Sequence, residues 1–216
     1  RPGLQLARGA TLVAVTLSIV LAFRHMPMTQ VYAIGLSAPL VAAALAVWFL
    51  REVPHWSQWL LTALGFLGVL VALRPDAPDA GWHLALPVSF ALWSAAYHVT
   101  TRIASRSETT AAQLFYVAFF ACLMLTAALP WAWTTMPAAD WALLLAGAMF
   151  GTLAHLLLIA AFTRAPTAVV SPMVYFQIVW AALVGYLVFG EVPQASTLAG
   201  ALIVAVSGIC LLRARG

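Results

Sequence analysis

Long apolar stretches alternate with short polar segments along the whole chain. Each stretch is close to the roughly 20 residues that an α-helix needs to cross the hydrocarbon core of a bilayer. The charges fall mostly between the stretches, as at 75–79 and 102–108. The pattern predicts eight transmembrane helices, at residues 9–23, 29–50, 56–73, 82–101, 111–129, 141–162, 168–189 and 196–212.

Composition supports the same conclusion. Hydrophobic residues make up 64% of the chain and charged residues only 7%, which leaves too little polar surface for a water-soluble globule. We therefore expect an all-α polytopic membrane protein whose main partner is the lipid bilayer. The net charge of +4 is carried by arginine, and on such a chain it is a topology signal, so no nucleic-acid partner is expected.

The chain repeats itself at a distance of 139 positions. Leu-Arg-Glu-Val-Pro at 50–54 and Phe-Gly-Glu-Val-Pro at 189–193 each close one apolar stretch and lead into the next, and the shift carries Glu52 onto Glu191. Internal duplication within an apolar chain is typical of transporter folds. Corresponding helices are five apart, an odd number, so the two copies are predicted to have opposite orientations.

The two copies differ in length. The second, at 82–213, has five predicted helices, whereas the first, at 1–74, has three. The chain also opens on Arg1, and Arg-Pro-Gly resembles neither a signal peptide nor a natural cytoplasmic start. We therefore expect two further helices before it, and a complete protein of ten helices in two inverted five-helix repeats.

The arginines predict the orientation, because cytoplasmic loops retain positive charge. If the chain starts inside, only Arg24 and Arg74 lie outside. Both chain ends are then cytoplasmic, with Glu52 at the cytoplasmic face and Glu191 at the outer face. The arginines on the cytoplasmic side are Arg1, Arg8, Arg51, Arg102, Arg106, Arg164, Arg213 and Arg215.

An ordered series of residues resembles the EamA-type repeat of the drug/metabolite transporter superfamily. In the first copy the matching residues are Pro39, Glu52 and Gly65. In the second they are Gly151, Thr152, Leu153, Ala154, His155, Ala161, Phe162, Ala165, Pro166, Ser171, Pro172, Tyr175, Gly190, Glu191, Gly200 and Gly208. The resemblance implies ten helices, a location in the cytoplasmic membrane and transport of small molecules. Abundant alanine and arginine with no lysine favour a bacterial source, so the inner membrane of a bacterium is expected.

One departure from the family pattern concerns a helix break. In the family, proline often stands thirteen residues before the glutamate of the repeat, as Pro39 does before Glu52, but the second copy has Ile178 at that position. We therefore expect that the second copy does not break its helix as the first does.

The glutamates at the repeat junctions are predicted to be structural. Glu52 and Glu191 each stand two residues before a proline, Pro54 and Pro193, which suits the first position of a helix. There a carboxylate meets the positive end of the following helix. The remaining acids are loop charges, so carboxylate-driven proton coupling is not predicted in this part of the protein.

A substrate pocket is predicted from deep polar and aromatic residues on inward helix faces. Each such group needs a partner, because an unpaired polar group in hydrocarbon costs several kcal/mol, roughly 2–7 by transfer estimates. Hydrogen bonding between helices remains the alternative role for each of them. The predicted pocket residues are Pro39, Trp93, His98, His155, Tyr175 and Gln177, with Trp180 as a further wall. This lining suits a neutral, zwitterionic or aromatic metabolite.

Other chemistries find little support. Gly147 and Gly151 form a small-xxx-small pair, for which close helix packing is predicted. Cys122 and Cys210 are single thiols in separate helices, and the histidines have no carboxylate or cysteine at ligand spacing, so no metal or cofactor is expected.

The sequence thus predicts a secondary transporter of small organic metabolites, with alternating access around a site between the inverted repeats. A membrane-embedded enzyme that uses His98 and His155 as acid or base on a lipid substrate is the alternative, and a noncatalytic scaffold is a third. Pairing of two copies into a homodimer is open.

Overall fold

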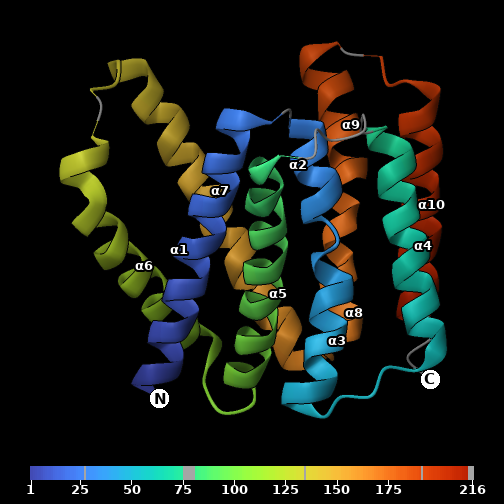
Figure 1. Cartoon of the computed structure of the whole chain (residues 1–216), viewed down its shortest axis with the longest axis horizontal. Coiled ribbons are helices and arrows are strands. Elements are labelled where there is room, and N and C mark those ends of the chain that lie inside the picture. The colour runs from blue at the N-terminus through green and yellow to red at the C-terminus, as the bar shows by residue number, and fades with distance from the viewer. Residues whose placement is uncertain (27, 75–80, 134, 191, 214–216) are drawn as a thin grey trace.

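The computed structural model describes residues 1–26, 28–74, 81–133, 135–190 and 192–213. These residues form helices and no strand, arranged as an upright bundle (Figure 1). The α-helices are α1 (Pro2–His25), α2 (Met28–Gly35), α3 (Ala38–Leu50), α4 (Trp56–Leu73), α5 (Ala85–Ser105), α6 (Thr110–Ala132), α7 (Ala138–Arg164), α8 (Thr167–Val170), α9 (Gln177–Phe189) and α10 (Ala195–Arg213). Two 3-10 helices, η1 (Trp82–Leu84) and η2 (Ser171–Phe176), complete the described elements.

Seven spans in the described part of the chain are long and apolar enough to cross a membrane. Two of them are composite, because Gln30–Leu50 joins α2 to α3 and Thr167–Val188 joins α8, η2 and α9. The eighth predicted helix is α5, which has 21 residues and carries polar side chains such as His98 and Arg102. The protein is therefore a polytopic all-α membrane protein, as the sequence predicted.

The expectation that only the first copy breaks its helix is wrong. In the first copy α2 ends at Gly35 and α3 starts at Ala38, with Pro39 in its first turn. In the second copy the six residues of η2, Ser171–Phe176, separate α8 from α9. Pro172 accounts for this break, since proline has no N–H to donate and suits the start of a helical segment.

The 139-residue shift carries the helix boundaries of one copy onto the other. Met28, Ala38 and Trp56, which start α2, α3 and α4, map onto the starts of α8, α9 and α10. The residues after α3 and α9 are Arg51 and Gly190, and both take the left-handed backbone conformation, with φ of 55° and 69°. This conformation is a common way to end an α-helix. In Figure 1 the paired helices run in opposite directions.

Helices α4 and α10 pack side by side and antiparallel, with little space between their backbones (Figure 1). A Cβ at Gly68 would lie 3.0 Å from the carbonyl oxygen of Gly200, so glycine is required for this approach. At the counterpart position, the Ser207 hydroxyl donates to the carbonyl oxygen of Leu61 at 2.5 Å. The 139-residue shift exchanges these two contacts, so the two helices are related by a local two-fold arrangement.

Helix α7 packs differently from the sequence prediction. Gly147 and Gly151 were expected to bring helices together, but a Cβ added at either glycine would meet nothing within 4 Å. Both residues are exposed, because α7 contacts the rest of the described chain mainly through its last turns, where Ile159 and Phe162 are fully buried. Their predicted packing role is therefore not seen within this chain.

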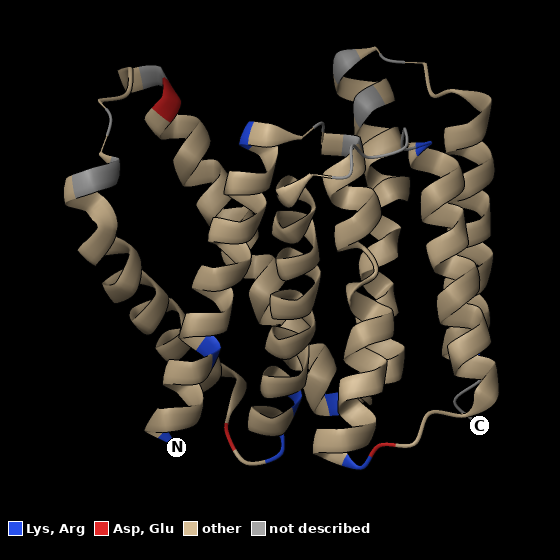
Figure 2. Ribbon diagram, viewed as in Figure 1, with Lys and Arg blue, Asp and Glu red and all other residues tan. Residues whose placement is uncertain are grey.

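The arginines gather at one end of the bundle. Figure 2 shows most of the blue positions at the end that carries both chain ends, and few at the opposite end. This end holds the start of α1 and the ends of α3, α5, α7 and α10, whereas Arg24 and Arg74 lie at the far ends of α1 and α4.

The close α4–α10 contact gives a first prediction. Gly200→Ala should lower the melting temperature, because its Cβ would lie 2.6 Å from the Ala72 backbone nitrogen; overpacking of this kind costs about 1–3 kcal/mol. Gly147→Ala is the matched control and should leave stability unchanged or raise it, since alanine favours a helix by up to about 1 kcal/mol. Thermal unfolding of the detergent-solubilised variants measures both, and equal behaviour of the two would contradict this packing.

The opposed copies give a second prediction. Val53 and Val192 lie one shift apart at opposite ends of the bundle and are 84% and 81% exposed. After replacement of Cys122 and Cys210, Val53→Cys should react with an impermeant thiol reagent only from the cytoplasmic side, and Val192→Cys only from outside. Labelling of both from the same side of sealed vesicles would refute the inverted arrangement.

Candidate functional site

A cleft of about 740 Å³ opens between α7, the broken segment α8–η2–α9 and the end of α10. Polar groups reach it from His98 of α5, His155 of α7, Ser171 of η2 and Gln177 of α9. Its other lining residues are apolar or small, namely Gly151, Ala154, Leu157, Leu158, Ala161, Val169, Val170, Met173, Val174, Phe176, Trp180 and Leu212. An apolar cavity with a few convergent polar groups is typical of a small-molecule site.

His98 is anchored from across the cleft. Its side chain is largely buried, and its Nδ1 lies 2.9 Å from the Ser171 hydroxyl at the first residue of η2. The Phe162 ring lies 5.5 Å from the imidazole, centre to centre. The hydrogen bond therefore ties α5 to the break between α8 and α9. His98 thus has both of the roles that the sequence offered as alternatives, hydrogen bonding between helices and lining of the pocket.

His155 is held by Tyr97. The Tyr97 hydroxyl lies 3.1 Å from His155 Nδ1, and the two rings meet edge to face. Tyr97 is itself only 4% exposed. The hydrogen bond fixes the imidazole against α5, so its other nitrogen faces away from the tyrosine.

Behind Tyr97 lies Arg8, which the sequence analysis placed among the cytoplasmic loop arginines. The structure corrects this, because Arg8 is in α1 and fully buried. Its guanidinium lies 5.8 Å from the centre of the Tyr97 ring, and its Nη1 donates to Gln5 Oε1 at 2.7 Å. Gln5 in turn donates to Glu108, which the sequence analysis expected to be a solvated loop charge.

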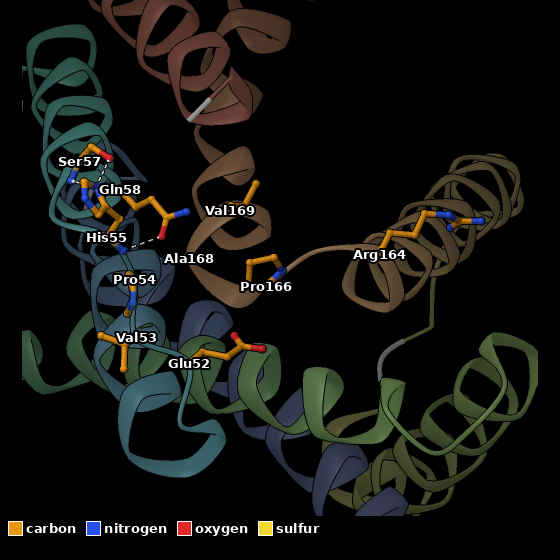
Figure 3. Close-up of a pocket in the computed structure, with 10 residues that line it drawn as sticks. All are labelled: Glu52, Val53, Pro54, His55, Ser57, Gln58, Arg164, Pro166, Ala168 and Val169. Atoms are coloured by element: carbon orange, nitrogen blue, oxygen red, sulfur yellow. Dashed lines mark hydrogen bonds between the residues drawn. The ribbon is translucent and has the colours of Figure 1, made fainter. Parts of the chain in front are cut away.

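Two neighbouring cavities share lining residues with the cleft. One of about 620 Å³ lies at the arginine-rich end of the bundle and shares Val169 with the cleft. In Figure 3 the Glu52 carboxylate points into it from the α3–α4 connection, opposite Pro166, and the Gln58 amide points into it from the first turn of α4. The other, of about 540 Å³, reaches Leu73 at the far end of α4 and shares Gln177 and Trp180 with the cleft.

The structure brings together half of the predicted pocket residues. His98, His155 and Gln177 line the cleft, and so does Trp180. Ser171 and Val169 line it as well but were not among the predicted pocket residues; the nearby Pro172 was the available signal for Ser171.

The other three predicted pocket residues lie outside the cleft. Tyr175 is buried against α4, where its ring would touch a Cβ at Gly65 at 2.7 Å. Pro39 is buried in the first turn of α3, and Trp93 is 44% exposed on α5. Tyr175 and Gln177 are two positions apart, which places them on different faces of a helical segment, and Tyr175 takes the face toward α4.

Glu52 joins three elements at the arginine-rich end. Its Oε1 accepts from Arg102 Nε at 2.7 Å and Arg106 Nη2 at 3.1 Å, and its Oε2 accepts from the Thr167 N–H at 3.0 Å. Burial raises the pKa of Glu52, but the hydrogen bonds from Arg102 and Thr167 and the charge of Arg102 outweigh it and hold the pKa below the usual carboxyl value.

The helix that Glu52 meets differs from the one predicted. Helix α4 starts at Trp56 and is capped by His55 and Gln58, so Pro54 stands two residues before the helix and not at its first position. The carboxylate instead meets the start of α8, in the other copy. Pro193 likewise stands two residues before α10, while Glu191 lies outside the described residues.

Metal chemistry finds no support in the described ranges, which contain no group of three or more His, Cys, Asp or Glu that could hold a metal ion. Cys122 and Cys210 are both exposed free thiols.

Known proteins resemble this chain along nearly its whole length. The sequence model of a family described as the EamA-like transporter family matches residues 4–74 and 81–213. An S-adenosylmethionine uptake transporter of Rickettsia bellii is 30% identical over 94% of this chain and 70% of its own length. A riboflavin transporter of Vibrio cholerae is 29% identical over 84% of this chain and 61% of its own, and a pseudopaline exporter of Pseudomonas aeruginosa is 28% identical over 90% and 69%.

A solved crystal structure of another protein shares the fold. It superposes with a TM-score of 0.81 over 96% of this chain and 76% of its own, at 14% sequence identity. At that identity the likeness concerns the arrangement of helices alone.

The Glu52 cluster gives a third prediction. Glu52→Gln should cost on the order of 2 kcal/mol of unfolding free energy near pH 7, less than for a fully buried pair, since Arg106 is half exposed. The folded pKa lies below the ordinary 4.5, so this contribution is complete above 4.5 and lost as the pH falls through the folded value. The difference from the parent should therefore shrink in acid.

The matched control is Asp140→Asn, an acid-to-amide change at an exposed position in the first turn of α7. Thermal unfolding in detergent across the acid range measures all three proteins. A Glu52→Gln deficit that stays constant with pH would contradict the role of the carboxylate charge.

Proposed function

Because the chain belongs to the EamA-like transporter family, we propose that it is a secondary transporter that moves a small organic metabolite through the cleft by alternating access. The family consists of small-molecule permeases, and the seven apolar spans make this chain an integral membrane protein. Membership in a family of transporters also sets aside the membrane-embedded enzyme that the sequence left as an alternative.

The observation that carries the proposal is the row of three cavities. These cavities lie along the broken segment α8–η2–α9. The cleft shares Val169 with the cavity beside Glu52, and it shares Gln177 and Trp180 with the cavity that reaches Leu73. The row begins beside Glu52 at the arginine-rich end and reaches Leu73 at the opposite end of α4. A solute bound in the central cleft would therefore have one neighbouring cavity toward each end of the bundle.

The break between α8 and α9 supports a binding role for this segment. Transporters build their sites at discontinuous helices, where irregular backbone lines a cavity and is not exposed to lipid. In this chain η2 contributes Ser171, Met173, Val174 and Phe176 to the cleft. The corresponding break in the first copy, at Leu36 and Ser37, places Leu36 beside the cavity of about 540 Å³ that reaches Leu73.

We further propose that the arginine-rich end is cytoplasmic and that the membrane is the inner membrane of a bacterium. The described arginines near this end are Arg1, Arg8, Arg51, Arg102, Arg106, Arg164 and Arg213, against Arg24 and Arg74 at the other. The positive-inside rule then makes both chain ends cytoplasmic. In this arrangement the cavity beside Glu52 is the cytoplasmic route to the cleft.

S-adenosylmethionine is the first candidate substrate, because the uptake transporter of Rickettsia bellii is similar to this chain along 94% of its residues. A cleft of about 740 Å³ lies within the range of roughly 300–1,000 Å³ that holds small ligands. Riboflavin is the second candidate, since a transporter of that vitamin is also similar.

The fourth prediction tests the site. The protein, reconstituted in liposomes, should exchange radiolabelled S-adenosylmethionine, and His155→Ala and Gln177→Ala should each weaken binding by roughly tenfold, which is about 1.4 kcal/mol. The melting temperature of Gln177→Ala should stay near the parent value, because its side chain borders the open cleft, whereas His155→Ala also removes the partner of the Tyr97 hydroxyl and should melt lower. His25→Ala, at an exposed position at the end of α1, is the matched control and should bind normally.

Two outcomes would contradict this proposal. Unchanged substrate affinity in both cleft variants would remove the site, whatever the flux. Absence of flux with S-adenosylmethionine, riboflavin and a panel of amino acids and nucleosides would count against transport of small organic metabolites through this cleft.

A further inference from the structure

The geometry points to a carboxylate subsite at the His155 end of the cleft, which selects solutes that carry a carboxylate, either anionic or zwitterionic. This inference rests on the proposed function, because it names the chemical class of the substrate that the cleft binds. The subsite consists of His155 and Tyr97, with Arg8 behind them as the source of positive charge.

The first argument is the charge of the lining. Among the residues that the structure describes, those around the cleft include two histidines, a serine and a glutamine but no aspartate or glutamate. A cleft of this kind offers hydrogen-bond donors and no negative charge to repel an anion. Glu52 lines the neighbouring cavity, but its carboxylate is engaged by Arg102, Arg106 and the Thr167 N–H.

The second argument is that neutral groups alone hold the Arg8 guanidinium directly. Its hydrogen bonds go to the Gln5 side chain, the Thr101 hydroxyl at 3.3 Å and the Gln113 carbonyl oxygen at 3.3 Å. Its Nη2 is buried and has no partner in the described part of the chain. Glu108 is connected to it only through Gln5, so the positive charge is not neutralised by contact.

The third argument is the path from this charge to the cleft. Arg8 lies over the Tyr97 ring, and the Tyr97 hydroxyl meets His155 Nδ1. A nearby cation strengthens the phenol as a donor, since hydrogen bonds in a chain polarise one another. When Tyr97 donates to Nδ1, the imidazole carries its hydrogen on Nε2 and presents a donor to the ligand.

The low dielectric of the bundle extends the reach of Arg8. Two charges interact across several ångströms far more strongly in a protein interior than in water. Arg8 does not line the cleft, so it acts as a positioning residue that orients Tyr97 and makes the potential at His155 favourable for an anion. The rest of the lining is apolar, with Trp180 as an aromatic wall for the remainder of the solute.

Matched probes test the subsite. S-adenosylmethionine and its decarboxylated analogue differ only in the carboxylate, and L-tryptophan and L-tryptophanamide differ in its charge. We expect the acid of a pair to bind the reconstituted protein at least roughly tenfold more tightly than its partner. Tyr97→Phe, which removes only the hydroxyl, should reduce this ratio to within about threefold while the partner without a carboxylate binds as before.

Tyr116→Phe is the control, because Tyr116 is 44% exposed on α6 and its hydroxyl has no partner in the ranges that the structure describes. It should keep the full ratio. Arg8→Lys should retain a preference for the acid and Arg8→Gln should lose it; should Arg8→Gln fail to fold, Tyr97→Phe decides the question.

The outcomes separate this inference from the proposed function. If riboflavin or an amide is transported and neither acid binds more tightly than its matched partner, the proposed transport function is supported and the carboxylate subsite is overturned. An equal loss of acid and amide binding in Tyr97→Phe would show a structural role for Tyr97 and would also overturn it. Absence of binding by both members of both pairs would also overturn the carboxylate subsite.

Discussion

Hydrocarbon offers no hydrogen-bond partners, and this constraint governs how the helices of the bundle are joined. His98 reaches Ser171 across the cleft, His155 reaches Tyr97, and the Ser207 hydroxyl reaches a backbone carbonyl of the neighbouring helix. Each of these bonds joins two helices that are far apart in the sequence. The polar residues therefore hold the apolar helices in register, because apolar surfaces alone gain little by leaving lipid for one another.

The same constraint explains which parts of the fold could be predicted from the sequence. Apolar length and the 139-residue repeat predicted the helices, and the structure carries the starts of α2, α3 and α4 onto those of α8, α9 and α10. The break at η2 was not predicted, because the position equivalent to Pro39 is 178, which holds isoleucine, and the proline of the second copy, Pro172, lies six residues earlier. A single proline is weak evidence in a sequence, since it also occurs at ordinary helix starts.

The site was only partly predictable. Helix periodicity placed His98, His155 and Gln177 on inward faces, and they meet in the cleft. It failed for Tyr175, which takes the face toward α4, and for Arg8, whose burial depends on Thr101 and Gln113 from two other helices besides Gln5 of its own. Such long-range partners leave no local signal, so a charge near a helix start was taken for a loop charge.

The paired contacts between α4 and α10 carry a consequence for the energetics of the transport cycle. In an inverted-repeat transporter, the two end states arise when the copies exchange conformations. Here Gly68 and Gly200 form one contact, and the Ser207 hydroxyl, which donates to the Leu61 carbonyl oxygen, forms its counterpart. In the alternating-access cycle proposed above, such an exchange would not return an equivalent molecule, so the two end states would differ in free energy.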